Sequence, residues 1–199
     1  MRKTTGIVVL IVAFFSFISC KKDNNSTDSS ALTGSWTFMG MHAITSATAI
    51  DKGAGFNTKI ITTSDYTTIG NAGSVAISGN TMTGTGITYS SNIILFATEY
   101  EDDVFLDTFS TALPFTVPPT SSTSGFEVIG KDSIHYTGTS LLGSGGSGMP
   151  ASTGAKFSIS GNILTLTSSV VQDKSTDEGN GETLSQHETA TVVSTLQKQ

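Results

Sequence analysis

Cysteine and arginine are almost missing from this 199-residue chain, which holds one cysteine, Cys20, and one arginine, Arg2. A single cysteine excludes an intramolecular disulfide, so an exported form would depend on its core alone. From Cys20 onward the chain carries eight lysines and sixteen acidic residues, a net charge of −8, with no guanidinium group to bind phosphate or carboxylate. The composition therefore argues against nucleic acid and other anionic partners.

Signatures of catalysis and of metal binding are missing as well. The three histidines, His42, His135 and His187, are far apart, and no H-E-x-x-H, G-x-S-x-G or calcium-loop pattern occurs. We therefore predict no enzyme, no metal ion and no cofactor, with His135 on the solvent side of its strand. The acidic runs at 99–103 and 173–182 are predicted to be solvated hairpin loops, with a calcium site or a glycosidase carboxylate pair as the alternative.

The N-terminus has the three parts of a secretory signal. Residues 1–5 are basic, residues 6–17 form an uncharged apolar run, and Ile18 and Ser19 lead into Cys20. The apolar run has 12 residues, well short of the roughly 20 that a helix needs to cross a bilayer. The pattern predicts a segment that directs export and is then removed.

The residues Phe17, Ile18, Ser19 and Cys20 resemble the lipobox of bacterial lipoproteins. The resemblance implies that residues 1–19 are a lipoprotein signal peptide cleaved before Cys20. It also implies a diacylglyceryl group on the Cys20 sulfur and an acyl chain on the new N-terminus, and several acyl chains hold a protein durably on a membrane. A free surface thiol after ordinary signal cleavage is the alternative.

Residues 20–30 are polar apart from the cysteine, so we predict that they form the lipidated residue and a flexible tether. Lys21, Lys22 and Asp23 resemble the charged segment that follows the lipidated cysteine in Bacteroidetes lipoproteins sent to the cell surface. The resemblance implies a cell-envelope protein held in the outer membrane by its lipid, on either the periplasmic or the cell-surface face. Residues 31–199 remain as a single β domain.

Threonine and serine make up 60 of the 199 residues, beside 21 glycines, whereas long runs of Ala, Leu, Glu and Lys at helical period are absent. Threonine favours strands, and serine and glycine favour turns. The candidate strands are short, as at 81–89, 92–98 and 104–109, and turn residues separate them. This pattern predicts an all-β domain that is either a barrel or a β-sandwich.

One hairpin pattern occurs twice, as I-S-G-N-T-M-T at 77–83 and as I-S-G-N-I-L-T at 159–165. In both, Gly-Asn suits a tight turn with positive φ, and apolar and hydroxyl residues alternate beside it. Both segments are predicted to be hairpins. Convergence on the same turn chemistry explains the similarity, and an ancient duplication is the alternative.

Gly34, Ser35 and Trp36 open the first predicted strand and resemble the G-x-W motif of lipocalins, and the hairpin at 157–167 resembles the end of lipocalin-like lipoproteins of Bacteroidetes. The resemblance implies an up-and-down antiparallel β-barrel with Gly34 and Trp36 as structural residues. It also implies an interior that holds a small apolar ligand. The arginine that closes lipocalin barrels has no counterpart, because Arg2 is the only one. A β-sandwich is the alternative fold.

Three of the four prolines fall within residues 113–119, where they remove backbone donors and disfavour a central strand. The segment is predicted to be a stiff connection on the surface. In a barrel it could instead be a lid over the open mouth, with Leu113, Phe115 and Val117 facing a ligand.

These observations predict a membrane-anchored exported lipoprotein that binds a small apolar ligand without catalysis. A surface interaction or glycan-binding module is the alternative, with Tyr66, Tyr89, Tyr100 and Phe115 as candidate exposed aromatics. An enzyme would need polar groups that converge in a pocket. The expected partners are the membrane, through the lipid anchor, and a small apolar molecule or a glycan.

Overall fold

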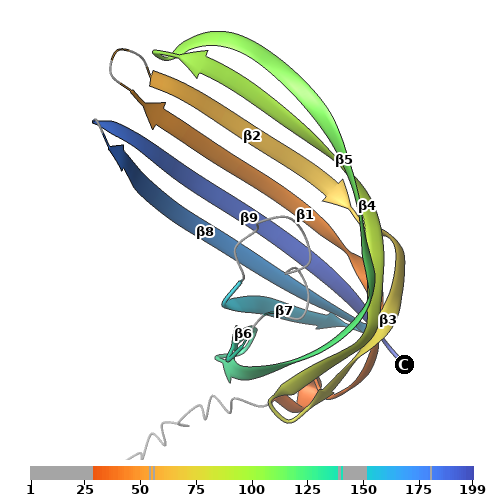
Figure 1. The fold of residues 1–199 in the computed structure, drawn as a ribbon. Helices are drawn as coiled ribbons and strands as arrows, with labels where there is room; N and C mark the ends of the chain where they lie inside the picture. Colours follow the sequence, from red (N-terminus) through yellow and green to blue (C-terminus); the bar gives the residue numbers. More distant parts are fainter. Residues whose placement is uncertain (1–28, 54, 56, 139, 141–151, 180) are drawn as a thin grey trace, which may run out of the picture.

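The computed structural model describes residues 29–53, 55, 57–138, 140, 152–179 and 181–199, so the predicted signal peptide and Cys20 lie outside it. The described residues form one short 3-10 turn and nine strands: η1 (Ser29–Ala31), β1 (Gly34–Lys52), β2 (Asn57–Thr67), β3 (Ile69–Ser78), β4 (Thr81–Glu101), β5 (Val104–Ile129), β6 (Ser133–Tyr136), β7 (Gly154–Ser160), β8 (Ile163–Gly179) and β9 (Glu182–Lys198). All nine strands belong to one antiparallel sheet (Figure 1), which confirms the predicted all-β class. Within these ranges no helix is long and apolar enough to span a membrane.

The strands follow one another around the sheet in an up-and-down ring. β2 and β3 lie end to end and together occupy one strand position beside β1. β1 pairs with β3 through residues 34–37 and with β2 through residues 42–52. From β3 to β9 each strand pairs with the next, and β9 returns to pair with β1. The predicted up-and-down antiparallel order is therefore confirmed.

Hydrogen bonds close this ring at one end only, which we call the closed end. β6 has four residues and β7 has seven, whereas their neighbours β5 and β8 have 26 and 17. Beyond β6 and β7, β5 pairs only with β4, and β8 only with β9, among the described residues. The sheet continues there as a curved, open sheet of six strands whose hairpin tips form the open end (Figure 1).

Apolar side chains fill the interior of the closed end. The largest fully buried ones are Leu32, Trp36, Phe38, Val75, Ile77, Met82, Phe126, Leu164 and Leu196. Every residue of the described core lies between Leu32 and Leu196, and every described strand lies between Gly34 and Lys198. The chain from Ser29 to Gln199 therefore contains all of the described core and all of the described strands.

Trp36 lies at the centre of the closed end, as the resemblance to lipocalins implies. It is fully buried, and its indole nitrogen donates a hydrogen bond of 2.9 Å to the carbonyl of Leu32. η1 presents that carbonyl, so Ser29 and Ser30, which the sequence assigned to the tether, belong to the folded part. At the other end of the chain, the Lys198 ammonium lies 5.4 Å from the centroid of the Trp36 ring, within cation–π range.

The strands are longer than the sequence indicated. The predicted strands at 81–89 and 92–98 are one strand, β4, and the predicted connection at 113–119 lies inside β5. The prediction of a connection there was wrong because, among the described residues, only β4 pairs with this length of β5. A proline without an N–H group is tolerated where the other edge of its strand is free.

Both predicted Gly-Asn hairpins are confirmed. Gly79 and Gly161 have φ angles of 55° and 59°, and the asparagines after them do not have positive φ, as in type II′ turns. In each turn the asparagine carbonyl accepts a backbone hydrogen bond from the next strand of the ring, from Phe126 in β5 or from Lys198 in β9. Each turn is thereby held at the rim of the closed end.

We expect Trp36→Ala, made in the chain from Ser29 to Gln199, to lower the free energy of unfolding by about 3–5 kcal/mol, because it empties the centre of the core. Trp36→Phe keeps most of the ring and loses the donor to Leu32, so its cost should be smaller, about 1–3 kcal/mol. Urea denaturation followed by circular dichroism measures both. An alanine variant as stable as the parent chain would contradict a central role for Trp36.

Candidate functional site

Beyond the closed end, the inward side of the open sheet forms a concave face (Figure 1). Successive residues of a strand point to opposite sides, so every second residue continues the inward set. In β1, buried Ala43 is followed on the same side by Thr45, Ala47 and Ala49. We use the name concave face for these residues and the inward residues beside them on the other five strands.

The strand registers arrange the concave face in rows from β8 to β5. One row consists of Gln172, Glu188, Ala47, Thr62, Ala97 and Phe109, and the next, nearer the open end, of Lys174, Gln186, Ala49, Ile60, Glu99 and Asp107. Ala47 and Ala49 of β1 are small side chains in the middle of these rows, whereas β5 contributes Phe109 and Asp107 at one end. The middle of the face is therefore lined by small side chains, and larger ones lie on its β5 side.

Four aromatic rings lie where the concave face meets the core. The Tyr89 ring centroid is 5.9 Å from those of Phe38 and Phe115, and the Phe115 and Tyr66 centroids are 6.1 Å apart. Burial raises the pKa of Tyr66 and of Tyr89, and the charge of Tyr66 raises the pKa of Tyr89 further. Both phenols therefore stay neutral at physiological pH, and we call these four rings the aromatic floor.

The three predicted ligand-binding residues lie on the concave side of β5. Leu113 is 43% exposed, whereas Phe115 and Val117 are partly buried against the core. They lie in a strand and not in a lid, and their part in ligand binding stays a prediction. Phe109, on the same side and 49% exposed, was missed. Phe109 and Leu113 are an even number of residues apart, so alternation along a strand would place them on the same side. The prolines between 113 and 119 indicated a loop, and this relation was therefore overlooked.

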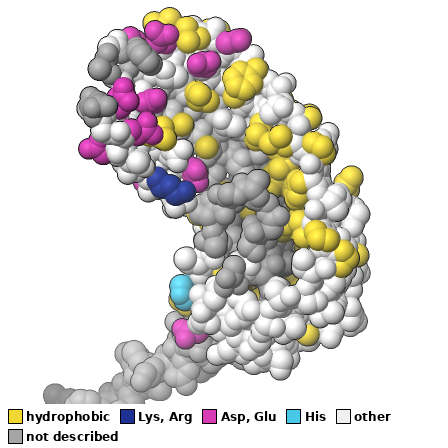
Figure 2. Space-filling model, in the orientation of Figure 1, with side chains coloured by type: hydrophobic (Ala, Val, Ile, Leu, Met, Phe, Trp, Pro, Cys, Tyr) yellow, Lys and Arg dark blue, Asp and Glu magenta, His cyan; other side chains and the backbone are white. Residues whose placement is uncertain are grey.

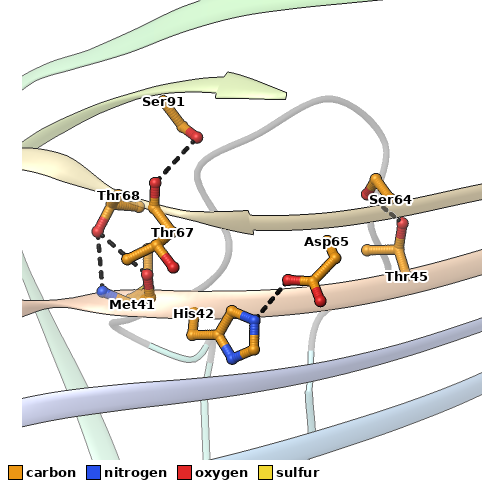
Figure 3. Close-up of polar contacts among 8 residues, drawn as sticks. All are labelled: Met41, His42, Thr45, Ser64, Asp65, Thr67, Thr68 and Ser91. Atoms are coloured by element: carbon orange, nitrogen blue, oxygen red, sulfur yellow. Dashed lines mark hydrogen bonds and ion pairs between the residues drawn. The ribbon is translucent and has the colours of Figure 1, made fainter. Parts of the chain in front are cut away.

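Polar contacts brace the sheet at the level where it bends away from the closed end (Figure 3). Thr68, between β2 and β3, donates its backbone N–H to the Met41 carbonyl (2.9 Å) and accepts the Met41 N–H on its hydroxyl (2.8 Å). Beside it the Ser91 hydroxyl donates to the carbonyl of Thr67. Register shifts fall at the same level between Phe38 and Gly40, and such bulges strengthen the local twist. Thr68 therefore supplies hydrogen bonds in place of the regular backbone ladder at the point where β2 ends and β3 begins.

Side chains on the two faces of the same strands form different contacts (Figure 3). On the concave face, the hydroxyls of Thr45 and Ser64 are 2.7 Å apart, and Ser64 is buried. On the convex face, His42 pairs with Asp65 across β1 and β2, and both side chains are exposed to solvent. The concave face at this level is therefore uncharged, and the ion pair lies on the other side of the sheet.

A shallow groove of about 390 Å³ crosses β1, β8 and β9 on the convex face, lined in part by Thr48, Ile50 and His187. His187 Nδ1 lies 2.7 Å from Asp173 Oδ1, which leaves Nε2 of the ring free. The His187 and Asp173 side chains are 53% and 76% exposed, so water screens both. Histidine–aspartate pairs in catalysis usually sit in a pocket that excludes water, and this open groove provides none.

Residues of β2 hold the acidic turn between β4 and β5 at the open end. Asp102 and Asp103 have φ angles of 47° and 63°, as a type I′ turn requires. The backbone N–H of Asn57 donates to the Asp102 carboxylate (3.0 Å), and Lys59 pairs with Asp103 and lies 4.7 Å from the Tyr100 ring centroid. The hydrogen bond from Lys59 lowers the pKa of Asp103. The acidic run predicted as a hairpin loop at 99–103 does contain a hairpin turn, but the turn is limited to Asp102 and Asp103, and Glu99 and Glu101 belong to β4.

The three histidines do not meet in the fold. His135 is exposed, as predicted, opposite Glu127, whereas His42 and His187 each pair with an aspartate on separate strands. In the part of the chain that the structure describes, no group of three or more histidine, cysteine, aspartate or glutamate side chains could hold a metal ion.

Comparisons with known proteins assign no family to the chain. A scan against protein-family models, a search of curated proteins and a search of solved structures all found no match. Its function has to be inferred from its own residues.

We expect Thr68→Val to lower the free energy of unfolding by about 1–3 kcal/mol, because it leaves the buried N–H of Met41 without its hydroxyl acceptor. Thr67→Val is the matched control, since the Thr67 side chain is exposed and only its carbonyl is used. Thermal and urea unfolding of both variants test this. Equal stability of the two would show that the Thr68 hydroxyl does not brace the bend.

Proposed function

We propose that the protein is an exported lipoprotein, anchored in the outer membrane through acyl chains on Cys20, that binds a small apolar molecule on its concave face without catalysis. The observation that carries the binding proposal is the exposure of inward-facing apolar side chains. Phe109 and Leu113 are 49% and 43% exposed, and Ile93 and Leu95 lie beside them on β4. We call these four residues the apolar wall.

The apolar wall and the aromatic floor together favour an apolar ligand. Removing apolar surface from water contributes about 25 cal/mol per Å², so a ligand that covers exposed leucine and phenylalanine side chains gains affinity from each. Polar groups at this level, such as the Thr45–Ser64 pair, are already hydrogen-bonded to each other. They therefore keep their hydrogen bond when a ligand that cannot form hydrogen bonds covers them.

Several features support a lipocalin-like interpretation of the barrel. Gly34 begins β1, Trp36 is buried in the closed end, and the strands run up and down around the ring. Lys198 supplies a cation to the Trp36 ring in a chain whose only arginine is Arg2. Because the closed end is packed with side chains, the proposed ligand lies in the open half of the sheet.

The alternative glycan-binding or surface interaction module has less support, because its aromatic candidates do not share an exposed surface. Tyr66, Tyr89 and Phe115 form part of the aromatic floor. Tyr100 contacts the Phe105 ring, with centroids 6.2 Å apart, and the ammonium of Lys59. Sugar-binding platforms need open aromatic faces, and three of the four candidates are turned inward.

The proposed anchor fits the position of the folded part. Eight residues, 21–28, lie between Cys20 and η1, so an extended chain spans about 30 Å at most between them. A tether of that length would let the open end face the aqueous phase while the acyl chains stay in the membrane.

We expect Cys20→Ser to abolish lipid attachment, because serine lacks the thiol that receives the diacylglyceryl group. The variant should leave the membrane fraction and lose incorporation of radiolabelled palmitate, and Ser26→Ala in the tether should change neither property. Cell fractionation and palmitate labelling measure the outcome. A serine variant that is labelled and retained like the parent would disprove the anchor.

We expect Phe109→Ser combined with Leu113→Gln to weaken binding of the neutral dye N-phenyl-1-naphthylamine by about tenfold or more, because the two changes remove most of the apolar wall. The matched control is Phe96→Ser combined with Ile94→Gln. These residues lie on the convex side of the same hairpin and are 53% and 44% exposed. Fluorescence titration compares the pairs, and an equal loss in both would contradict binding on the concave face.

A further inference from the structure

The concave face changes character from the closed end toward the open end. Near the closed end its residues are uncharged, as in the row formed by Val170, Ala190, Thr45 and Ser64. The next rows bring in carboxylates, Glu188 beside Ala47 and then Glu99 and Asp107, and the last inward position of β1 is Asp51. Glu101 of β4 lies in the same row as Asp51, because both are paired with Thr58 of β2. We call Asp51, Glu99, Glu101, Asp107 and Glu188 the inward carboxylates.

The inward carboxylates lack cationic partners. The side-chain carboxylates of Asp51, Glu99 and Glu188 form no hydrogen bond or ion pair with another described residue, and that of Asp107 accepts only the backbone N–H of its neighbour Thr108 (2.7 Å). The nearest lysines in sequence on β1 and β2, Lys52 and Lys59, point to the convex side by alternation, and Lys59 pairs with Asp103. Among the described inward residues, only Lys174 on β8 is basic.

Glu99 and Asp107 face each other directly across β4 and β5. Like charges at directly opposed positions of a sheet destabilise it, so this arrangement costs the fold stability that a bound cation would restore. Other acidic side chains gather at the same end of the molecule, over the hairpin tips (Figure 2), and add to the negative potential there. The apolar wall is close by, since Asp107 and Phe109 are two residues apart on one strand, about 7 Å.

We propose that the ligand of the concave face is a cationic amphiphile. Its apolar part lies against the apolar wall and the aromatic floor, and its positive group lies beside Glu99 and Asp107, while Glu188, three strands from Glu99, adds to the negative potential of the face. This inference rests on the proposed function and names its ligand class. An anionic amphiphile such as a fatty acid would meet several carboxylates and, among the described inward residues, only Lys174 as a counter-ion.

The test compares three probes with the same twelve-carbon chain: dodecyltrimethylammonium, dodecyl maltoside and dodecanoate. Each is titrated by calorimetry, below its critical micelle concentration, into the chain from Ser29 to Gln199, which contains all of the described core and strands. We expect the cationic probe to bind about tenfold or more tightly than the neutral one, and the anionic probe more weakly than both. Raising the salt concentration to about 1 M should remove most of this preference, because the Debye length falls to about 3 Å.

The decisive variant is Glu99→Gln, Asp107→Asn and Glu188→Gln together, which keeps the shape of the face and neutralises three of the inward carboxylates. The matched control is Glu127→Gln, Asp132→Asn and Asp177→Asn, which removes three exposed acids outside the concave face and changes the net charge equally. We expect the first variant to lose most of the preference for the cationic probe and the control to keep the preference of the parent. Circular dichroism confirms that both variants fold.

The outcomes separate the two proposals. If the three probes bind the parent equally well, or dodecanoate binds best, the cationic ligand class is wrong and an apolar binding site stands. If the control loses the preference as fully as the first variant does, net charge and not the inward carboxylates determines binding, which also overturns the inference. If none of the probes binds, the proposed function itself fails, and this inference fails with it.

Discussion

The closure of the sheet at one end only is the constraint on which the rest of the structure depends. The strand ring requires β6 and β7 to join β5 to β8, and these two strands are only four and seven residues long. Apolar side chains around Trp36 fill the ring that they complete. The longer strands then extend beyond the core. On that part of each strand, the side chains on the inward side face solvent instead of packing against an opposite wall.

The change from closed ring to open sheet takes place at a single level. Irregular registers occur there in β1, β3, β4 and β5, and Thr68 binds the backbone of Met41 where β2 gives way to β3. Position 73, at this level, requires glycine, because a Cβ there would lie only 2.6 Å from the Gly86 carbonyl oxygen. Bulges increase local twist, so a group of them at one level bends the whole sheet and creates the concave face.

The high content of serine and threonine has a structural use in such a sheet. Hydroxyls meet across strands at Ser90–Thr116 and Ser169–Thr191, in addition to the pair on the concave face. β-branched and hydroxyl side chains suit surfaces that are only half buried. Against this background of small polar residues, the exposed phenylalanine and leucine on the inward side of β5 stand out as candidates for binding.

Elements whose physics is local could be predicted from the amino-acid sequence. Threonine content with little helical periodicity gave the all-β class, and Gly-Asn between alternating residues gave both type II′ hairpins, because turn geometry depends on a few neighbouring residues. The G-x-W motif marked the residue at the centre of the core. Leu113, Phe115 and Val117 were named as ligand-facing residues of a possible lid, and the structure places them instead on the concave side of a strand.

Only the tertiary structure decided where strands end, which edges are free and which side chains share a face. The prolines near 113–119 indicated a loop, because proline is excluded from strands that are paired on both edges. A sequence does not reveal that, among the described residues, this part of β5 pairs on one edge only. Glu99 and Glu188 are 89 residues apart and reach one face through the registers of three strand pairs. Register is a property of pairing between distant segments, and for that reason the charge pattern of the concave face could not be derived from the chain alone.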